Sequence, residues 1–138
     1  MGYAIDLRKL KGKVVLVTGG ARALGRAYAL RLAKLGADIV INDINLDSAK
    51  EFGEKLTAES VTTEIEEIGV RSLGIECSVA DRDAVFAMVD EILATFGRLD
   101  ILINNAAIFP AEYFLYQAVL LHFRFHCSTL TLALFGVF

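Results

Sequence analysis

The 138-residue sequence contains only two cysteines, and it has no surplus of positive charge. Two cysteines, Cys77 and Cys127, are too few for a disulfide framework, so a reducing compartment, the cytoplasm, is predicted. The 14 Lys and Arg are outnumbered by 17 Asp and Glu, which gives a net charge of −3. Without surplus cations to neutralise phosphates, nucleic acid is not an expected partner.

Charged residues almost disappear towards the C-terminus. From Phe109 to Phe138 only Glu112 and Arg124 are charged, and six of the nine phenylalanines lie in this stretch. The change in composition predicts one domain over residues 9–108 and an atypical hydrophobic tail over 109–138. Only 14 residues follow Arg124, fewer than the ~20 that a spanning helix needs, so no membrane span is expected.

Four short apolar runs predict four strands, and between them the sequence has helical periodicity. The predicted strands cover residues 14–17, 39–41, 72–77 and 99–103. Such alternation with short connections implies right-handed crossovers and a parallel sheet. We therefore predict an α/β, Rossmann-like, doubly wound fold, truncated to about four strands in the order 3-2-1-4, followed by the hydrophobic tail.

Three helices are predicted after the first three strands. The first has apolar residues at helical spacing, namely Leu24, Tyr28, Leu32 and Leu35. The second is expected to start at an Asp47 cap and run towards Ile68, with a kink or inserted turn around residues 57–63. In the third, Asp81 is the expected cap and Gly97 the expected end. Its apolar stripe contains Val85, Met88, Val89, Ile92, Leu93 and Phe96.

A glycine-rich turn, Thr18 to Gly25, joins the first strand to the first helix. Such a turn lets backbone amides approach a pyrophosphate, and the helix N-terminus adds partial positive charge. The alternative is an ordinary tight turn whose glycines allow helix and strand to pack closely. Glycines alone do not decide between the two interpretations.

Asp43 follows Gly19 by 24 positions and ends the second predicted strand. A carboxylate at this place can accept hydrogen bonds from both ribose hydroxyls of a dinucleotide. Its charge would repel a 2′-phosphate, which favours NAD over NADP. The alternative is a carboxylate that only caps a helix or closes a turn.

In these motifs the chain resembles a short-chain dehydrogenase/reductase over roughly residues 9–108. The family's Thr-Gly-x-x-x-Gly-x-Gly is matched by Thr18, Gly19 and Gly25, with Ala23 replacing the middle glycine. Its Asn-Asn-Ala-Gly appears as residues 104–107, and its Asp-Val after the third strand as Ser78-Val79. The resemblance implies these cofactor-binding residues: Gly19, Arg22, Ala23, Leu24, Gly25, Asp43, Ser78, Val79, Asn105 and Ala106.

Some positions depart from the family pattern. The methyl group of Ala23 stands where backbone should approach phosphate, and Ser78 lacks the carboxylate that accepts the adenine amine. Arg22 occupies a position where NADP-preferring relatives carry a basic residue. Because the charge of Asp43 repels the extra phosphate directly, NAD remains the expected cofactor and NADP the less favoured one.

The resemblance implies oxidation of a secondary alcohol, or reduction of a ketone, by hydride transfer. The family uses a Ser and a Tyr-x-x-x-Lys pair for this chemistry. The four tyrosines of this chain are followed four positions later by Leu7, Leu32, Gln117 and Leu120. No catalytic residue is therefore assigned, and the alternative is an inactive nucleotide-binding remnant or interaction module. A 3-hydroxyacyl-CoA thioester and a small alcohol or ketone both stay open as the relatives' substrate.

The hydrophobic tail allows several further expectations. His122 and His126 lie one helical turn apart without a third convergent ligand, so no metal site is predicted. The abrupt end of the resemblance favours the hypothesis of a non-native reading frame or an aberrant C-terminus. A helix is predicted over residues 112–123, and it could cover the fourth strand. If it does not, the unpaired apolar edge of that strand should promote self-association.

Overall fold

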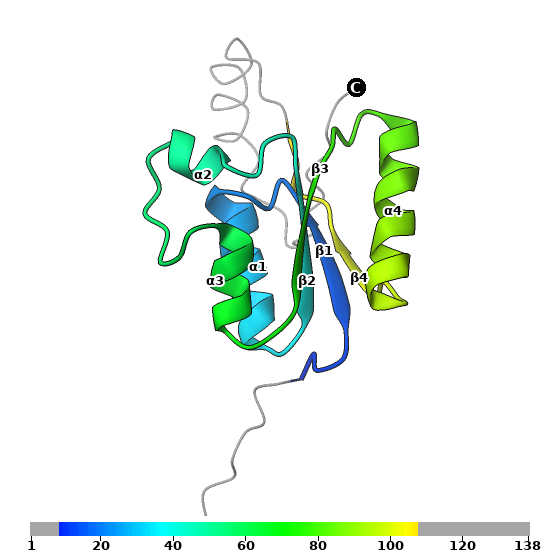
Figure 1. Cartoon of the computed structure of the whole chain (residues 1–138), viewed down its shortest axis with the longest axis horizontal. Coiled ribbons are helices and arrows are strands. Elements are labelled where there is room, and N and C mark those ends of the chain that lie inside the picture. Colours follow the sequence, from blue (N-terminus) through cyan, green and yellow to red (C-terminus); the bar gives the residue numbers. More distant parts are fainter. Residues whose placement is uncertain (1–8, 108–138) are drawn as a thin grey trace, which may run out of the picture. The chain divides into compact units, whose positions relative to one another are not determined.

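The computed structural model describes residues 9–107 as alternating strands and helices (Figure 1). The elements are β1 (Val14–Thr18), α1 (Ala23–Lys34), β2 (Asp38–Asp43), α2 (Ser48–Glu51), α3 (Val61–Glu67), β3 (Ser72–Glu76), α4 (Arg82–Phe96) and β4 (Ile101–Ile103). The four strands are parallel in the order β3-β2-β1-β4, which confirms the predicted Rossmann-like sheet. The predictions for the tail over 109–138, including its helix over 112–123, lie outside the described residues.

The sheet is covered on both faces, with α1 and α3 on one side and α4 on the other (Figure 1). Successive residues of β1 point to opposite faces, so Val15 and Val17 pack towards α1 and α3, whereas Val14 and Leu16 pack towards α4. All five residues of β1 are buried. This two-sided burial explains why the strand is a continuous apolar run rather than an alternating one.

The apolar stripe expected on α1 is buried only in part, because Leu32 packs against the core but the start of the stripe does not. Leu24 is 61% exposed and Tyr28 is 38% exposed, while Gly25, Ala29 and Ala33 face the core. Small side chains let the helix backbone approach the sheet closely. The fully buried face of α1 therefore consists of small residues rather than of large apolar ones.

The predicted helix from Asp47 to Ile68 is interrupted, as expected, but the interruption is longer than a kink. Only Ser48–Glu51 and Val61–Glu67 are helical. The Asp47 side chain makes no cap hydrogen bond, which contradicts its predicted role. The cap of α3 is Ser60, whose side chain accepts a 3.1 Å hydrogen bond from the Thr63 amide.

Helix α4 has the predicted ends. The Asp81 carboxylate accepts hydrogen bonds from the Asp83 and Ala84 amides at 3.0 and 3.1 Å, and Gly97 has the left-handed φ of +75°. The predicted stripe is too wide, because Leu93 is 45% exposed and only Met88 and Ile92 are fully buried. Within residues 9–107 no helix is both long and apolar enough to cross a bilayer.

Candidate functional site

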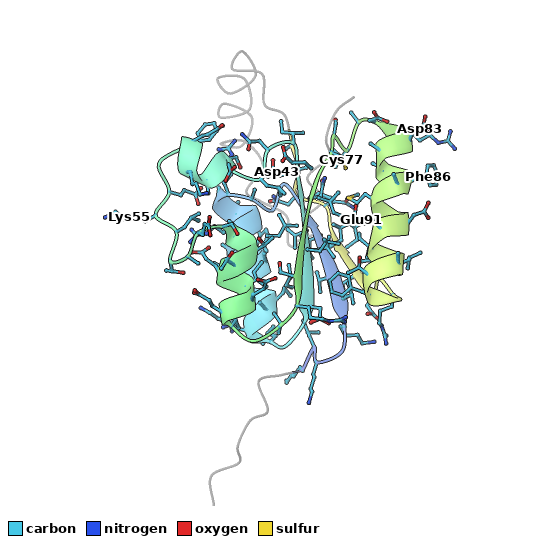
Figure 2. The ribbon with its side chains drawn as sticks, viewed as in Figure 1. Asp43, Lys55, Cys77, Asp83, Phe86 and Glu91 are labelled. Atoms are coloured by element: carbon cyan, nitrogen blue, oxygen red, sulfur yellow. The ribbon has the colours of Figure 1, made fainter. Side chains whose placement is uncertain are left out.

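The carboxyl ends of the parallel strands bring the predicted site residues to one edge of the sheet. Thr18 ends β1 and Asp43 ends β2, and these residues lie in neighbouring paired strands. Figure 2 shows Asp43 and Cys77, the residue after β3, at this same edge. Ligands of open α/β sheets bind outside the carboxyl ends of the strands.

The glycines of the turn after β1 are required by close packing. A side chain at Gly19 would place its Cβ 2.9 Å from the Ala106 Cα, and Gly19 has a φ of +62°. A Cβ at Gly25 would collide with the Gly19 carbonyl oxygen and lie 2.7 Å from the Asn105 Nδ2. The packing interpretation of these glycines is therefore correct, and it is compatible with a binding role for the exposed side of the turn.

Thr18 and Asn105 fasten the turn to the segment after β4. The Thr18 hydroxyl donates to the Ile103 carbonyl at 3.3 Å and accepts from the Asn105 and Ala106 amides at 3.0 and 3.1 Å. The Asn105 side-chain amide donates to the carbonyls of Thr18 and Gly19, at 3.1 and 3.0 Å. Asn105 and Ala106 thus adjoin the turn, and the Asn105 side chain holds the turn in shape.

The N-terminus of α1 retains hydrogen-bonding capacity for an anion. Arg22, at the N-cap position, makes no side-chain cap hydrogen bond. The Ala23 amide donates to the Glu54 carboxylate at 2.7 Å. The Leu24 and Gly25 amides have no acceptor among residues 9–107. The helix therefore offers two backbone donors and a positive dipole end, which fits the pyrophosphate of a dinucleotide.

Ala23 adopts a left-handed conformation, with a φ of +48°. It is the only non-glycine residue of the described chain with a positive φ. This region costs an L-residue roughly 1–2 kcal/mol and costs glycine almost nothing. The conformation explains why the family motif has glycine at this position.

The Asp43 carboxylate faces the glycine-rich turn. Its Oδ2 accepts from the Ala21 amide at 3.1 Å, and its Oδ1 accepts from the Ile44 and Asn45 amides at 2.8 and 3.4 Å. The structure thus shows the turn-closing role that was the alternative interpretation of Asp43. A carboxylate has about four acceptor positions, so these three contacts leave about one of them for a ribose hydroxyl.

The segment between α2 and α3 approaches the turn from the side, which sequence patterns did not indicate. The Arg22 guanidinium carbon lies 3.9 Å from the centroid of the Phe52 ring. Arg26 of α1 contacts the carboxylates of both Glu54 and Glu64. These contacts join residues about a quarter of the chain apart, and no local motif announces them.

Glu64 is a buried carboxylate held by Arg26 and Thr57. Arg26 donates to it from Nε and Nη2 at 2.8 and 2.7 Å, and Thr57 donates from its amide and hydroxyl. Burial by itself would raise the pKa of Glu64, but these hydrogen bonds outweigh it and the pKa is lowered. The hydrogen bond to Glu64 likewise raises the pKa of Arg26. The pair is therefore charged at neutral pH.

The residues after β2 and β3 expose apolar surface at the same edge. Val79 is 46% exposed and Ile44 is 71% exposed. The Ser78 hydroxyl accepts from the Ala80 amide at 3.2 Å and so closes a turn. Asn42, which precedes Asp43 in β2, is fully buried. Its side-chain amide donates to the Cys77 carbonyl at 2.9 Å and so links the ends of β2 and β3. The sequence signal for this role of Asn42 is a polar residue within an otherwise apolar strand.

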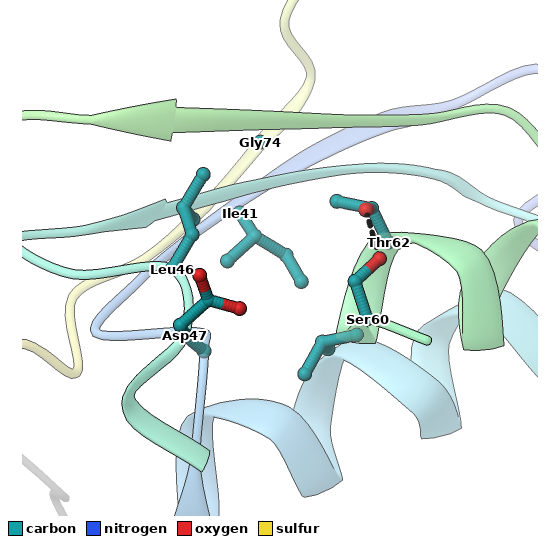
Figure 3. Close-up of a pocket in the computed structure, with 8 residues that line it drawn as sticks. Ile41, Leu46, Asp47, Ser60, Thr62 and Gly74 are labelled. Carbon is teal, nitrogen blue, oxygen red and sulfur yellow. Dashed lines mark hydrogen bonds between the residues drawn. The ribbon is translucent and has the colours of Figure 1, made fainter. Parts of the chain in front are cut away.

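A small cavity lies behind this edge, on the side of α1 and α3. Its volume is about 200 Å³, and it is lined by Ala21, Ile41, Leu46, Asp47, Ser60, Val61, Thr62 and Gly74. Figure 3 shows Leu46 and Asp47 across the cavity from Ser60 and Thr62. Ligand pockets usually enclose about 300–1,000 Å³, so this cavity is too small for a dinucleotide.

The candidate dinucleotide site is therefore the open edge at the carboxyl ends of the strands. Residues 9–107 contain no cluster suited to a metal ion.

Two oxidoreductases of known activity are similar to most of this chain. The chain is 48% identical over 104 residues to cyclohexanol dehydrogenase from Rhodococcus sp. (strain TK6), covering 73% of this chain and 38% of that protein. It is 44% identical over 96 residues to 3-oxoacyl-acyl-carrier-protein reductase FabG from Staphylococcus aureus, covering 70% and 36%. The chain thus spans less than half the length of these relatives.

Solved structures show the same fold with either dinucleotide. NAD⁺-bound xylitol dehydrogenase matches with a TM-score of 0.63 and 32% identity, covering 78% of this chain and 42% of that one. A metagenomic short-chain oxidoreductase in complex with NADP matches with a TM-score of 0.61 and 32% identity, covering 72% and 41%. The sequence profile described as short chain dehydrogenase matches residues 13–119, which include the glycine-rich turn, Asp43 and Asn105. Because this profile covers most of the sequence, the chain belongs to the short-chain dehydrogenase family.

Proposed function

We propose that residues 13–107 bind NAD and form the cofactor-binding part of an oxidoreductase. The observation that carries the proposal is the 3.1 Å hydrogen bond from the Ala21 amide to the Asp43 carboxylate. This contact brings the β2 carboxylate against the glycine-rich turn. A pyrophosphate and a ribose are adjacent groups of one dinucleotide, so they require adjacent binding groups.

The residues have distinct roles in this proposal. The Leu24 and Gly25 amides donate to the pyrophosphate, and Asp43 accepts from a ribose hydroxyl. The exposed side chains of Ile44 and Val79 offer an apolar surface to the adenine ring, with Ser78 as a polar neighbour. Gly19, Asn105 and Ala106 keep the turn in shape, so they support binding without supplying the main hydrogen bonds.

The preference for NAD rests on charge. Asp43 adds a negative charge at the ribose edge, and a 2′-phosphate there would place like charges together. The related solved structures hold NAD⁺ in one case and NADP in another, so relatedness alone does not select the cofactor.

In a full-length relative with the family's active site, the bound nicotinamide would exchange a hydride with a secondary alcohol or ketone. The 48% identity to cyclohexanol dehydrogenase favours a small alcohol over a 3-hydroxyacyl-CoA thioester as the substrate class. The low cysteine content supports a cytoplasmic location. Because the sequence contains no Tyr-x-x-x-Lys, we propose that the 138-residue chain binds the dinucleotide without catalysing the reaction.

Two measurements on the 138-residue chain test the proposal. Isothermal titration with NAD⁺ and with NADP⁺ should give the tighter binding for NAD⁺. NADH absorbance in the presence of cyclohexanol and other secondary alcohols should stay at the level of the protein-free control. Absence of heat with both dinucleotides would contradict the binding function, and NADH formation would contradict the assignment of an inactive chain.

A further inference from the structure

Two arginines lie beside the glycine-rich turn, and both are already engaged. Arg26 donates to the Glu64 carboxylate from two nitrogens, at 2.8 and 2.7 Å, and also contacts Glu54 at 3.4 Å. Arg22 stacks on the ring of Phe52, at 3.9 Å from its centroid. Figure 2 shows that the other nearby cation, Lys55, points away from the sheet edge.

The position of Phe52 is fixed by its neighbours. The Phe52 amide donates to the Ser48 carbonyl at 3.0 Å at the end of α2. Two residues later, Glu54 bonds to the Ala23 amide at 2.7 Å. The Arg26 Nη2 donates to the Lys55 carbonyl at 3.3 Å, which ties the same segment to α1. Although Phe52 is 65% exposed, its backbone is therefore held on both sides.

We propose that Phe52 is a specificity residue, which disfavours NADP by holding the Arg22 guanidinium away from the 2′-phosphate. This inference rests on the proposed function, because it assumes that a dinucleotide binds along the glycine-rich turn. A 2′-phosphate arriving at this edge meets the Asp43 carboxylate. It must also compete with an aromatic ring for Arg22, which follows the residue whose amide contacts Asp43. NAD lacks the 2′-phosphate, and the pyrophosphate that both dinucleotides share is assigned to backbone amides, so the orientation of Arg22 should affect NADP binding more than NAD binding.

The size of the effect follows from the strength of the stack. An exposed cation–π contact is worth about 0.5–1 kcal/mol, which corresponds to a factor of about two to five in an equilibrium constant. Releasing Arg22 should therefore strengthen NADP binding by about two- to fivefold. The affinity for NAD should change by less than about twofold, since NAD has no 2′-phosphate for the released cation to contact and its pyrophosphate is held by the backbone amides of α1.

The test uses isothermal titration of the chain with NAD⁺ and NADP⁺. The variant Phe52→Leu removes the ring and keeps an apolar side chain at an exposed position. Phe86→Leu on α4 is the matched control, because Arg82 stacks on Phe86 at 5.5 Å, away from the turn. The double variant Phe52→Leu, Arg22→Ala shows whether any gain depends on Arg22. Melting temperatures identify a variant that has lost its fold.

The inference predicts that Phe52→Leu strengthens NADP⁺ binding selectively. It also predicts that Phe86→Leu leaves both affinities unchanged and that the double variant loses the gain. An unchanged ratio of the two affinities in Phe52→Leu, or a gain that persists without Arg22, would overturn the inference and leave the proposed function standing. Failure of the unaltered chain to bind NAD⁺ would instead overturn the proposed function.

Discussion

The side-chain amide of Asn105 donates a 3.0 Å hydrogen bond to the carbonyl oxygen of Gly19, joining two residues 86 positions apart. The same amide reaches the Thr18 carbonyl at 3.1 Å. The segment after β4 therefore stabilises the glycine-rich turn from behind. The shape of the turn depends on a polar contact that forms only when the sheet is assembled.

Replacing Asn105 by Ala should destabilise the protein and weaken dinucleotide binding together. The change leaves two part-buried carbonyls without their donor, which should lower the free energy of unfolding by about 1–3 kcal/mol. Urea denaturation measures this loss. Asn104→Ala is the control, because Asn104 is exposed and its removal should cost less than about 0.5 kcal/mol. Equal effects of the two substitutions would show that the Asn105 hydrogen bonds are not what holds the turn.

Replacing Ala23 by Gly should stabilise the protein, which is an unusual result for glycine near a helix. Relief of the left-handed φ of +48° should raise the free energy of unfolding by about 1 kcal/mol. At Ala27, an exposed position within α1, the same substitution should lower it by about 1 kcal/mol. Thermal unfolding of both variants checks the opposite signs. If Ala23→Gly also destabilises the chain, residue 23 is not strained.

Replacing Glu54 by Gln should strengthen the binding of NAD⁺ and NADP⁺ alike. Glu54 places a carboxylate on the Ala23 amide at 2.7 Å, where it competes with the pyrophosphate that both ligands carry. Removing a charge at a helix N-terminus is worth about 0.3–1 kcal/mol, so affinities should rise by about two- to fivefold. Isothermal titration measures the gain, and Glu59→Gln, at an exposed position, serves as the control. A change in the ratio of the two affinities would contradict this role.

Replacing Glu64 by Gln should cost stability at neutral pH and cost less in acid. Loss of the buried partner of Arg26 should lower the free energy of unfolding by about 3–5 kcal/mol. The pKa of Glu64 is lowered in the folded protein, so its contribution is complete above the pKa of the unfolded carboxyl. The contribution is lost as the pH falls through the folded pKa.

Urea denaturation between about pH 7 and pH 3 measures this dependence. The difference between the unaltered chain and Glu64→Gln should shrink on acidification. Glu66→Gln, at an exposed position on the same helix, should show a small difference throughout. A Glu64→Gln deficit that is the same at every pH would mean that the charge of Glu64 does not contribute.

Features encoded by local patterns were predictable from the sequence. The continuous apolar run of β1 indicated a strand buried on both faces, and the Asp81 cap and Gly97 placed the ends of α4. The order of the strands followed from the alternation of elements and the handedness of crossovers. Asp43 was placed at the edge because a strand end can be recognised from where its apolar run stops.

Features that depend on tertiary packing were not predictable in this way. The buried face of α1 consists of small residues, whereas the periodicity of Leu24 and Tyr28 suggested another face. Phe52 and Glu54 lie in a segment without regular periodicity, and their partners are Arg22 and Ala23, about 30 positions earlier. Such contacts emerge only when the segment between α2 and α3 folds back over the start of α1.

The measurement that tests the account most directly is the ratio of NAD⁺ to NADP⁺ affinity in the unaltered chain and in Asp43→Asn. The account predicts tighter binding of NAD⁺ by the unaltered chain. Because a hydrogen bond to a charged group is worth about 1.5–3 kcal/mol, loss of the carboxylate should lower NAD⁺ affinity by about tenfold or more. The preference should then move towards NADP⁺. Tighter binding of NADP⁺ by the unaltered chain, or an identical ratio in Asp43→Asn, would contradict the account.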